Sequence, residues 1–223
     1  MPIPPLALVL DLDGTLVDSL PDIQAALSHT LQQANRRPVS LVEARSMLGD
    51  GAATLVARAL ALTGDPGTGL ERAAFLELFL AHYEAHSAVT TRCFPGVEST
   101  LHRLAADGHR LGVCSNKPHA ASVALVEQLG LDRLVHAVLG GDAIPQRKPD
   151  PEHLWATVRR MGAEGRPVVM VGDSRPDAAV AQNAGVPFVL ASYGYHRVPV
   201  AELPHDTLID RFDRLPEVLE GLI

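Results

Sequence analysis

Two carboxylates stand close together at the end of an apolar segment near the start of the chain. Residues 6–10, LALVL, are followed by Asp11 and Asp13, with Leu12 between them. Side chains at positions i and i+2 of a strand point to the same face. Two like charges are therefore directed at one place, where each raises the cost of ionising the other. Such an arrangement calls for a cation, or for a chemical use of the two acids.

Polar side chains also follow three later apolar segments of the chain. The segment "LGVC" leads into two polar residues, "AVLGGD" is followed by a lysine, and "VVMVG" leads into a cluster of acids. In open α/β sheets, ligands bind beyond the carboxyl ends of the strands. We therefore expect one shared site, to which these segments contribute Ser115, Asn116, Lys148, Asp173, Ser174 and Asp177.

This set of side chains suits metal-dependent phosphoryl transfer. Asp11, Asp13 and Asp173, with Asp177 behind them, offer the oxygen ligands that Mg²⁺ prefers. Hydroxyl, amide, ammonium and backbone N–H groups, here from Ser115, Asn116, Lys148 and Gly14, are donors for phosphoryl oxygens. One carboxylate could attack phosphorus, while the second protonates the leaving alkoxide and then deprotonates water. Each acid alone would be an ordinary turn or cap residue, so the prediction depends on their joint occurrence.

Strand-like and helix-like segments alternate through most of the chain. Apolar segments at 6–10, 110–116, 134–142, 167–173 and 187–192 alternate with helical patterns at 97–107, 119–129, 151–161 and 176–184. This alternation predicts an α/β fold with a doubly wound, Rossmann-like parallel sheet and helices on both faces.

A helical insert interrupts this pattern after the first strand and loop. Between about 38 and 92 the chain shows helical periodicity only. An earlier helix begins near Ser19, a candidate N-cap, with Pro21 in its first turn. We therefore expect an α/β core formed by residues 1–16 and 91–223, and an α-helical cap domain formed by residues 17–90.

The composition excludes several classes of protein. The chain is 47% hydrophobic and 20% charged, has a formal net charge of −7, and contains no Lys/Arg-rich run of the kind that binds nucleic acid. Its apolar stretches are far shorter than the ~18 residues that a membrane span needs. Cys93 and Cys114 form neither a disulfide framework nor a CxxC metal pair. We expect a cytoplasmic protein without a signal peptide, monomeric or homodimeric, that binds neither nucleic acid nor membranes.

Two further motifs have ordinary explanations. "GDPGTG" at 64–69 lacks the Lys-Ser/Thr ending of a phosphate loop and follows a helix, so it reads as an interhelical connection. His82 and His86 are one helical turn apart, as in a metal pair. They have neither a third ligand nor the glutamate of a zincin motif, so a solvated helix face is the preferred interpretation.

The motifs at the four strand ends resemble those of the haloacid dehalogenase superfamily of phosphotransferases. "DLDGTLVDS", "VCSN", the lysine of "QRKPDP" and "VGDSRPD" are similar to its four motifs in order. The resemblance implies an aspartyl-phosphate mechanism with Mg²⁺ as cofactor and an insert that closes over the site as a cap. It implies these roles: nucleophile Asp11; general acid/base Asp13; metal ligands Asp11, the Asp13 carbonyl and Asp173, supported by Ser174 and Asp177; phosphoryl binding by Ser115 and Lys148; positioning by Thr15.

Within the superfamily, the chain looks most like the phosphoglycolate phosphatases. The stretches "SNKPHAASVALVEQLGL", "GGDAIPQRKPDPEHL" and "MLGDGAATLVARAL" carry this similarity. Dehalogenases and phosphonate hydrolases lack an acid at the position of Asp13. The β-phosphoglucomutase branch usually carries Glu-Asp at the position of Gly172-Asp173. The resemblance thus implies a small phosphorylated metabolite, 2-phosphoglycolate first, as the substrate.

The cap contains one candidate for substrate recognition. Gly49 and Gly51 border the start of a predicted helix, whose N-terminus exposes N–H groups and a partial positive charge. Together with Arg45 or Arg58 it could hold the carboxylate of 2-phosphoglycolate. The two glycines serve equally well as a plain turn between helices.

Several other functions remain open at this stage. Within the same chemistry, the chain could be a sugar-phosphate phosphatase, a β-phosphoglucomutase-like mutase or a pyrophosphatase. A phospho-receiver domain also gathers carboxylates around Mg²⁺, but it carries its phospho-acceptor after a middle strand and is much shorter. A binding protein without activity is disfavoured because every motif position holds a competent residue.

Overall fold

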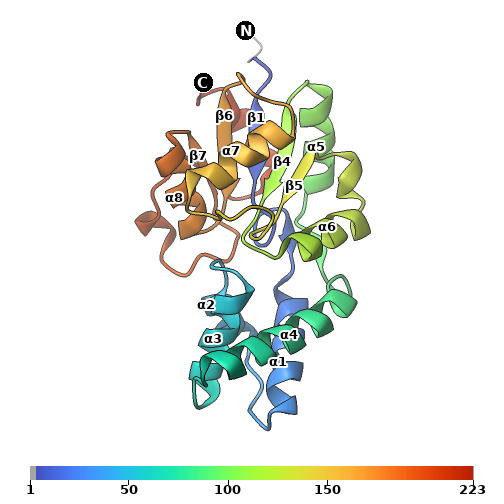
Figure 1. Cartoon of the computed structure of the whole chain (residues 1–223). Coiled ribbons are helices and arrows are strands. Elements are labelled where there is room, and N and C mark those ends of the chain that lie inside the picture. Colours follow the sequence, from blue (N-terminus) through green and yellow to red (C-terminus); the bar gives the residue numbers. More distant parts are fainter. Residues whose placement is uncertain (1–3, 223) are drawn as a thin grey trace.

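A parallel sheet forms the centre of the larger part of the molecule. The computed structural model describes residues 4–222. Within them, the strands of this sheet lie in the order β5-β4-β1-β6-β7-β8 and all pair in parallel (Figure 1). Their bounds are β1 (Ala7–Leu10), β4 (Arg110–Cys114), β5 (Ala137–Leu139), β6 (Val168–Gly172), β7 (Phe188–Ala191) and β8 (Thr207–Ile209). The predicted doubly wound α/β fold is confirmed.

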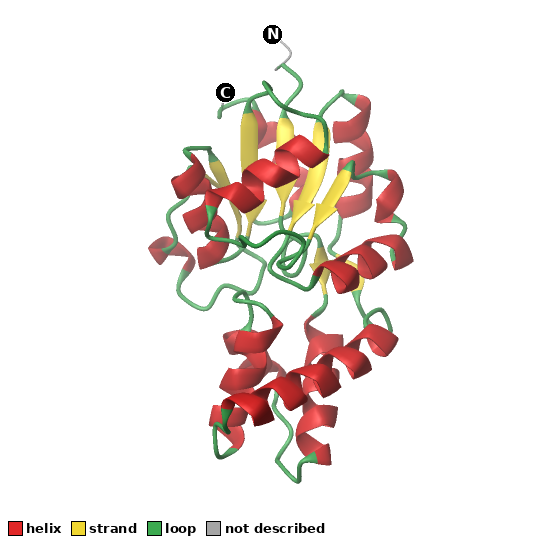
Figure 2. Ribbon diagram, viewed as in Figure 1, coloured by secondary structure: helices red, strands yellow, loops and turns green. Residues whose placement is uncertain are grey.

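Helices cover both faces of this sheet, as the alternation of strands and helices predicts (Figure 2). The central strand β1 directs Leu8 and Leu10 into one apolar cluster and Ala7 and Val9 into the other. Sheets buried on both faces have such continuously apolar strands. The first cluster includes residues of α5 (Val97–Ala106), α6 (His119–Gln128) and α9 (Leu215–Leu219); the second includes residues of α7 (Pro151–Arg160) and α8 (Arg175–Ala184).

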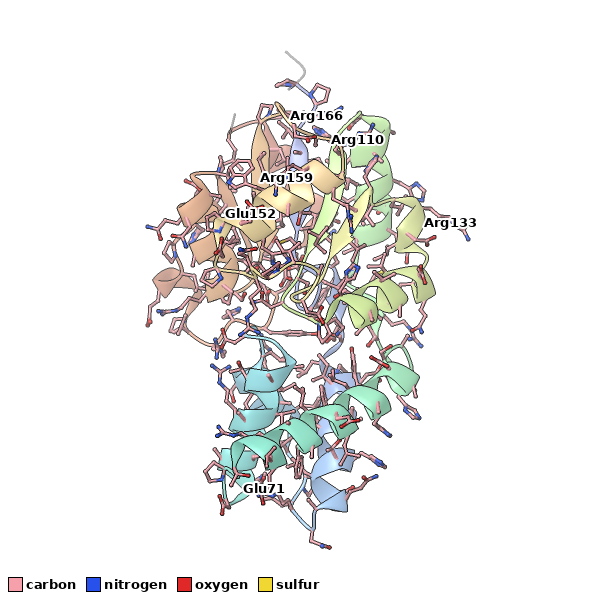
Figure 3. The ribbon with its side chains drawn as sticks, in the orientation of Figure 1. Glu71, Arg110, Arg133, Glu152, Arg159 and Arg166 are labelled. Carbon is pink, nitrogen blue, oxygen red and sulfur yellow. The ribbon has the colours of Figure 1, made fainter. Side chains whose placement is uncertain are left out.

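The insert is a helical unit with its own apolar core. It lies beyond the carboxyl ends of the strands, below the sheet in Figure 1. Residues such as Leu27, Leu60 and Phe79 are buried between its helices. A capping box formed by Thr68 and Glu71 begins the last of them, at the end of the cap far from the sheet (Figure 3). The helices are α1 (Leu20–Gln33), α2 (Leu41–Met47), α3 (Ala52–Thr63) and α4 (Gly69–His86), and residues 64–68 connect the last two.

The two chain segments that join core and cap are fastened together. The short strands β2 (Val17–Asp18) and β3 (Arg92–Cys93) pair antiparallel at this crossing. Just beyond them, the carboxylate of Asp22 accepts hydrogen bonds from the backbone N–H and hydroxyl groups of Thr90 and Thr91, at 2.5 to 3.0 Å. The helices of the cap lie within 17–90, and those domain boundaries remain a prediction.

The histidines of the cap form a stack. The ring of His82 lies 3.9 Å from that of His29 and 4.3 Å from that of His86, and the planes are nearly parallel. Within the described residues, this stack is not among the groups of possible ligands that lie close enough together to hold one ion. The same part of the chain contains no helix with the length and apolarity needed to cross a membrane.

Candidate active site

The predicted polar residues meet in a cavity of about 330 Å³ between the sheet and the cap. Loops after β1, β4 and β6, and the loop that precedes α7, supply its floor. The residues expected at the site that line it are Asp11, Asp13, Gly49, Gly51, Ser115, Asn116, Lys148, Asp173 and Ser174. Thr15 and Asp177 are fully buried and contact lining residues instead.

A buried ammonium lies between two carboxylates on this floor. Lys148 Nζ is 2.8 Å from Asp11 Oδ1 and 2.6 Å from Asp177 Oδ1. Burial, followed by the charge of Asp177, raises the pKa of Asp11 to about 7, although Lys148 opposes this shift. Burial alone would lower the pKa of Lys148, but the two carboxylates outweigh it and raise that pKa. Lys148 is therefore a fixed positive charge beside the proposed nucleophile.

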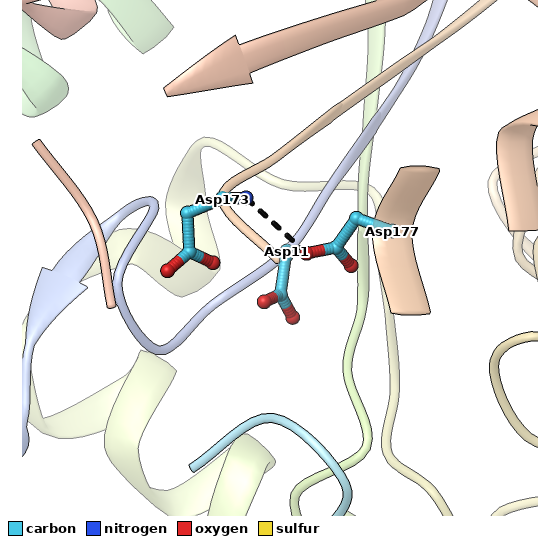
Figure 4. Close-up of side chains that lie close together, drawn as sticks. All are labelled: Asp11, Asp173 and Asp177. Carbon is cyan, nitrogen blue, oxygen red and sulfur yellow. Dashed lines mark hydrogen bonds between the residues drawn. The ribbon is translucent and has the colours of Figure 1, made fainter. Parts of the chain in front are cut away.

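Asp177 also fixes the turn that presents the next acid. Its Oδ2 accepts a hydrogen bond from the N–H of Asp173 at 3.2 Å (Figure 4). The same oxygen accepts from the N–H of Ser174 at 3.0 Å and from the hydroxyl of Ser174 at 2.5 Å. Both of its oxygens thus have protein partners. Asp173 is held in turn by the N–H of Tyr195 and by the hydroxyl of Thr15 at 3.4 Å.

Glycine is required where the chain passes closest to Asp173. Gly14 has φ +89°, and a side chain there would collide with the carboxylate of Asp173. This φ lies in the left-handed region, which favours glycine. The turn after β1 can therefore approach the acidic cluster closely.

The acidic cluster suits a divalent cation. Asp11, Asp173 and Asp177 each offer an oxygen within 4.8 Å of the others. Burial and then the neighbouring carboxylates of Asp177 and Asp11 raise the pKa of Asp173, as expected where like charges lie close together. With Asp13 and the two buried lysines of the site included, two negative charges remain when all groups are ionised. Mg²⁺ would offset this excess and prefers such hard oxygen ligands. Asp11 and Asp173 would hold it, supported by Asp177.

The second acid of the opening pair is separate from that cluster. One oxygen of Asp13 accepts a hydrogen bond from the hydroxyl of Ser19 at 2.5 Å, and both oxygens lie 3.1 Å from Lys117 Nζ. Ser19 stands at the N-cap of α1, but its side chain makes no cap hydrogen bond. The predicted N-cap position of Ser19 is thus confirmed, but its hydroxyl is directed to Asp13 and does not cap the helix.

Lys117 is the main site residue that sequence reasoning missed. It follows Ser115 and Asn116 directly, so its place at a strand end was available as a signal. Its ammonium is buried and also donates a hydrogen bond to the hydroxyl of Tyr83 in the cap, at 2.8 Å. The whole sequence contains two lysines, Lys117 and Lys148, and 17 arginines.

The residues expected to bind the phosphoryl group have different surroundings. The hydroxyl of Ser115 accepts a hydrogen bond from the N–H of Lys117 at 3.3 Å and faces the cavity. Asn116 Nδ2 donates to the carbonyls of Gly49 and Lys148, at 3.2 and 3.1 Å. Its buried Oδ1 has no hydrogen-bond partner within the described residues. Asn116 therefore links the core to the cap and leaves one acceptor for a ligand.

The expected cap arginines are engaged elsewhere. Arg45 donates to the carbonyl of Gly194, while Arg58 donates to the carbonyl of Met47 at 2.9 Å and to Asp50 at 2.6 Å. Among the described residues, neither arginine is part of the cavity wall. Each guanidinium holds the loop structure in this arrangement, and a place for either arginine beside the substrate remains a prediction. Asp50 also pairs with Arg197 of the core at 2.6 Å, and Arg197 does line the cavity.

The segment after β7 was also overlooked. Tyr195 donates its N–H to Asp173, its hydroxyl donates to Asp18 at 2.5 Å, and the same hydroxyl accepts the N–H of Leu20 at 3.0 Å. It therefore connects the acidic cluster to the beginning of the cap. The end of the predicted strand 187–192 would have indicated this segment, by the reasoning applied to the other four.

Comparisons with known proteins show what the whole chain is similar to. The family model of haloacid dehalogenase-like hydrolases matches residues 8–191. A phosphoglycolate phosphatase of Cereibacter sphaeroides is 43% identical over 215 residues, covering 96% of this chain and 98% of the relative. One of Rhodospirillum rubrum is 44% identical over 219 residues, covering 96% and 91%. The crystal structure of a predicted phosphoglycolate phosphatase from Haemophilus somnus superposes with a TM-score of 0.90 at 30% identity, covering 96% of this chain and 98% of the other.

Proposed function

The chain belongs to the haloacid dehalogenase-like hydrolase family, and from this premise we propose that it is a Mg²⁺-dependent phosphatase of 2-phosphoglycolate. Such an enzyme hydrolyses the phosphoric monoester 2-phosphoglycolate to glycolate and phosphate. The proposal of this substrate is supported by relatives that carry the name phosphoglycolate phosphatase and cover nearly the whole chain.

In the proposed reaction, Asp11 attacks phosphorus and forms an aspartyl-phosphate. Lys148 lies 2.8 Å from this carboxylate, where it can also offset charge on the phosphoryl oxygens. Mg²⁺, when bound, neutralises further charge on the phosphoryl group and on the acids around it. The hydroxyl of Ser115 is placed to orient that group, whereas the N–H groups of Gly14 and Thr15, expected to share this task, donate to the backbone carbonyls of Val17 and Leu12.

Asp13 is suited to the proton transfers of both steps. It follows the nucleophile by two residues and faces the same cavity, but it takes no part in the acidic cluster. From there it protonates the leaving oxygen in the first step and deprotonates the attacking water in the second. The cap above it keeps bulk water away from the phosphoryl group.

The single observation that carries the proposal is the Asp11–Lys148–Asp177 chain beside a separate Asp13. It gives one acid a fixed cation for phosphoryl attack and keeps the other outside the acidic cluster, at the wall of the same cavity, where it can transfer a proton. The test is Asp11→Asn, assayed with 2-phosphoglycolate and Mg²⁺ and for covalent incorporation of phosphate. We expect both turnover and labelling to disappear while the fold, followed by circular dichroism, is retained. Retained turnover would contradict the mechanism.

A sugar phosphate is a second candidate substrate. The cavity, at about 330 Å³, falls within the usual range for small-molecule sites of roughly 300–1,000 Å³ and so has room for more than a two-carbon acid. The unpartnered Oδ1 of Asn116 suits a substrate hydroxyl. A panel of sugar phosphates assayed beside 2-phosphoglycolate, with and without Mg²⁺, decides between them by kcat/KM.

A further inference from the structure

The ammonium of Lys117 lies beside the acid that would protonate the leaving oxygen. Its Nζ is 3.1 Å from each oxygen of Asp13, and both residues line the cavity. The side chain of Lys117 is 5% exposed. Burial alone would lower its pKa, but the Asp13 carboxylate and the Tyr83 hydroxyl outweigh this effect and raise it. Lys117 thus brings a permanent positive charge to this wall of the cavity.

One hydrogen-bond donor of this ammonium is free for a ligand. A lysine ammonium has three N–H donors. The two oxygens of the Asp13 carboxylate lie equally far from Nζ, at 3.1 Å, so they share one donor in a forked contact, and the hydroxyl of Tyr83 takes another at 2.8 Å. Within residues 4–222, no other hydrogen-bond acceptor contacts Nζ. The remaining donor belongs to a group that lines the cavity.

The other cations of the cavity wall are committed or more exposed. Lys148 is held between two buried acids, and Arg197 pairs with Asp50 of the cap at 2.6 Å. Arg175 is exposed. Of these four cations, Lys117 is the one in contact with Asp13. A second anionic group on the substrate, close to its leaving oxygen, would meet Lys117 first.

The choice of lysine is itself informative. The sequence uses arginine for 17 of its 19 Lys/Arg positions and lysine at these two buried places. An ammonium is a compact charge with rotatable donors, whereas a guanidinium is a planar fork. A compact group can touch Asp13, Tyr83 and a ligand from one atom.

We propose that Lys117 is the specificity residue of this site and that its ammonium binds the carboxylate of the substrate. A single methylene separates this carboxylate from the leaving oxygen. This inference rests on the proposed function, because it assigns the part of 2-phosphoglycolate that is not transferred. Lys117 reaches that carboxylate from the core, while Asp13 serves the leaving oxygen next to it.

The test compares two substrates that differ in this group. 2-Phosphoglycolate carries the carboxylate, and 2-hydroxyethyl phosphate replaces it with a neutral CH₂OH group. The readout is the ratio of kcat/KM for the first to that for the second, because any misplacement of Asp13 affects both substrates alike. Lys117→Met should lower this ratio about 10- to 150-fold, the range expected for a lost hydrogen bond between charged groups. The change should appear mainly as a higher KM for 2-phosphoglycolate.

Arg175→Met is the matched control, since it removes another cation from the cavity wall without touching Asp13. Its ratio should stay within about threefold of wild type, as expected for an exposed charge. If Lys117→Met leaves the ratio unchanged, or if Arg175→Met lowers it equally, the inference is overturned. A wild-type enzyme that hydrolyses 2-hydroxyethyl phosphate but not 2-phosphoglycolate would instead refute the proposed substrate, and one that hydrolyses neither would refute the proposed function.

A second variant keeps the test valid if Lys117→Met does not fold. Lys117→Arg retains a positive charge opposite Asp13 but replaces the compact donor with a planar fork. We expect the ratio to fall at least about threefold, because Arg and Lys are not equivalent at such a contact. A ratio equal to that of the wild type would contradict the assignment of the carboxylate to this donor.

Discussion

Lys148→Met removes the cation that two buried carboxylates share, and it should destabilise the protein strongly. Asp11 and Asp177 lie 2.8 and 2.6 Å from Lys148 Nζ, and Asp177 is fully buried. Methionine fills similar space without charge. The two acids would then face each other in the absence of metal, with no positive charge between them.

The expected loss is about 3–5 kcal/mol in the free energy of unfolding at pH 8, the cost of leaving a buried charge without its partner. For a chain of this size, each kcal/mol shifts Tm by roughly 2–4 °C, so Tm should fall by about 6–20 °C. The loss should shrink as the pH falls. The folded-state pKa of Asp11 is already raised, to about 7, above its ordinary value of 3.8. Stability from such a group is present at low pH and is lost as pH rises through the folded pKa.

Thermal unfolding in EDTA at pH 5.5 and pH 8 measures both effects. The double variant Lys148→Met/Asp11→Asn should recover at least about half of the loss at pH 8, because it removes one of the two opposed charges. Arg159→Gln is the control, since it breaks an ion pair with Glu152 whose side chains are about half exposed. That pair should contribute at most about 1 kcal/mol. A loss at Lys148→Met that is no greater than that of the control at pH 8, or that is larger at pH 5.5 than at pH 8, would refute the reasoning.

Three further predictions concern the surroundings of the site. Burial and then the charge of Lys148 lower the pKa of His153 to about 4, so the contribution of this residue to stability is present above pH ~6.5 and is lost as the pH falls toward 4. In His153→Gln, the free energy of unfolding measured with urea should therefore depend less on pH over that range. A pH dependence equal to that of the wild type would contradict this. Gly14→Ala should reduce kcat by more than about 10-fold and weaken Mg²⁺ activation, whereas Gly130→Ala, with a similar positive φ but open space around it, should leave both unchanged. Arg197→Gln breaks the partly exposed ion pair with Asp50 between core and cap, and by loosening the cap it should raise KM up to about 5-fold. Arg37→Gln breaks an ion pair with Glu43 within the cap and should leave KM unchanged. Equal KM values for the two variants would disprove this role of Arg197.

The fold could be predicted because its signals are local and repeated. Each buried strand reads as an apolar run, and each polar strand end stands at a place where a parallel sheet concentrates ligands. Strand β8 was missed because only one of its three residues is buried, and helix α9 because five residues are too few to show a helical period. Strand β8 pairs with β7 at the edge of the sheet, and α9 packs on one face of it, so both are fixed by tertiary contacts.

The acids of the site could be predicted, but their hydrogen-bond partners could not. Asp11 and Asp173 are recognisable from motifs, whereas the pairing of Asp13 with Lys117 depends on how two loops from different strands meet. Arg45 and Arg58 looked available in the sequence, yet each is used by a carbonyl or carboxylate that only the folded loops supply. Whether a charged side chain is available to a ligand therefore depends on the contacts that the folded structure supplies.

The scarcity of lysine gives the molecule a built-in reporter. Both lysine side chains lie in the cavity wall, one at the nucleophile and the other between Asp13 and the cap. Protein grown with ¹³C-labelled lysine therefore shows two ε-methylene resonances, both from the site, without background from the surface. Metal binding should move chiefly the signal of Lys148, and contact with a substrate carboxylate chiefly that of Lys117. One spectrum can thus follow metal binding and substrate binding separately.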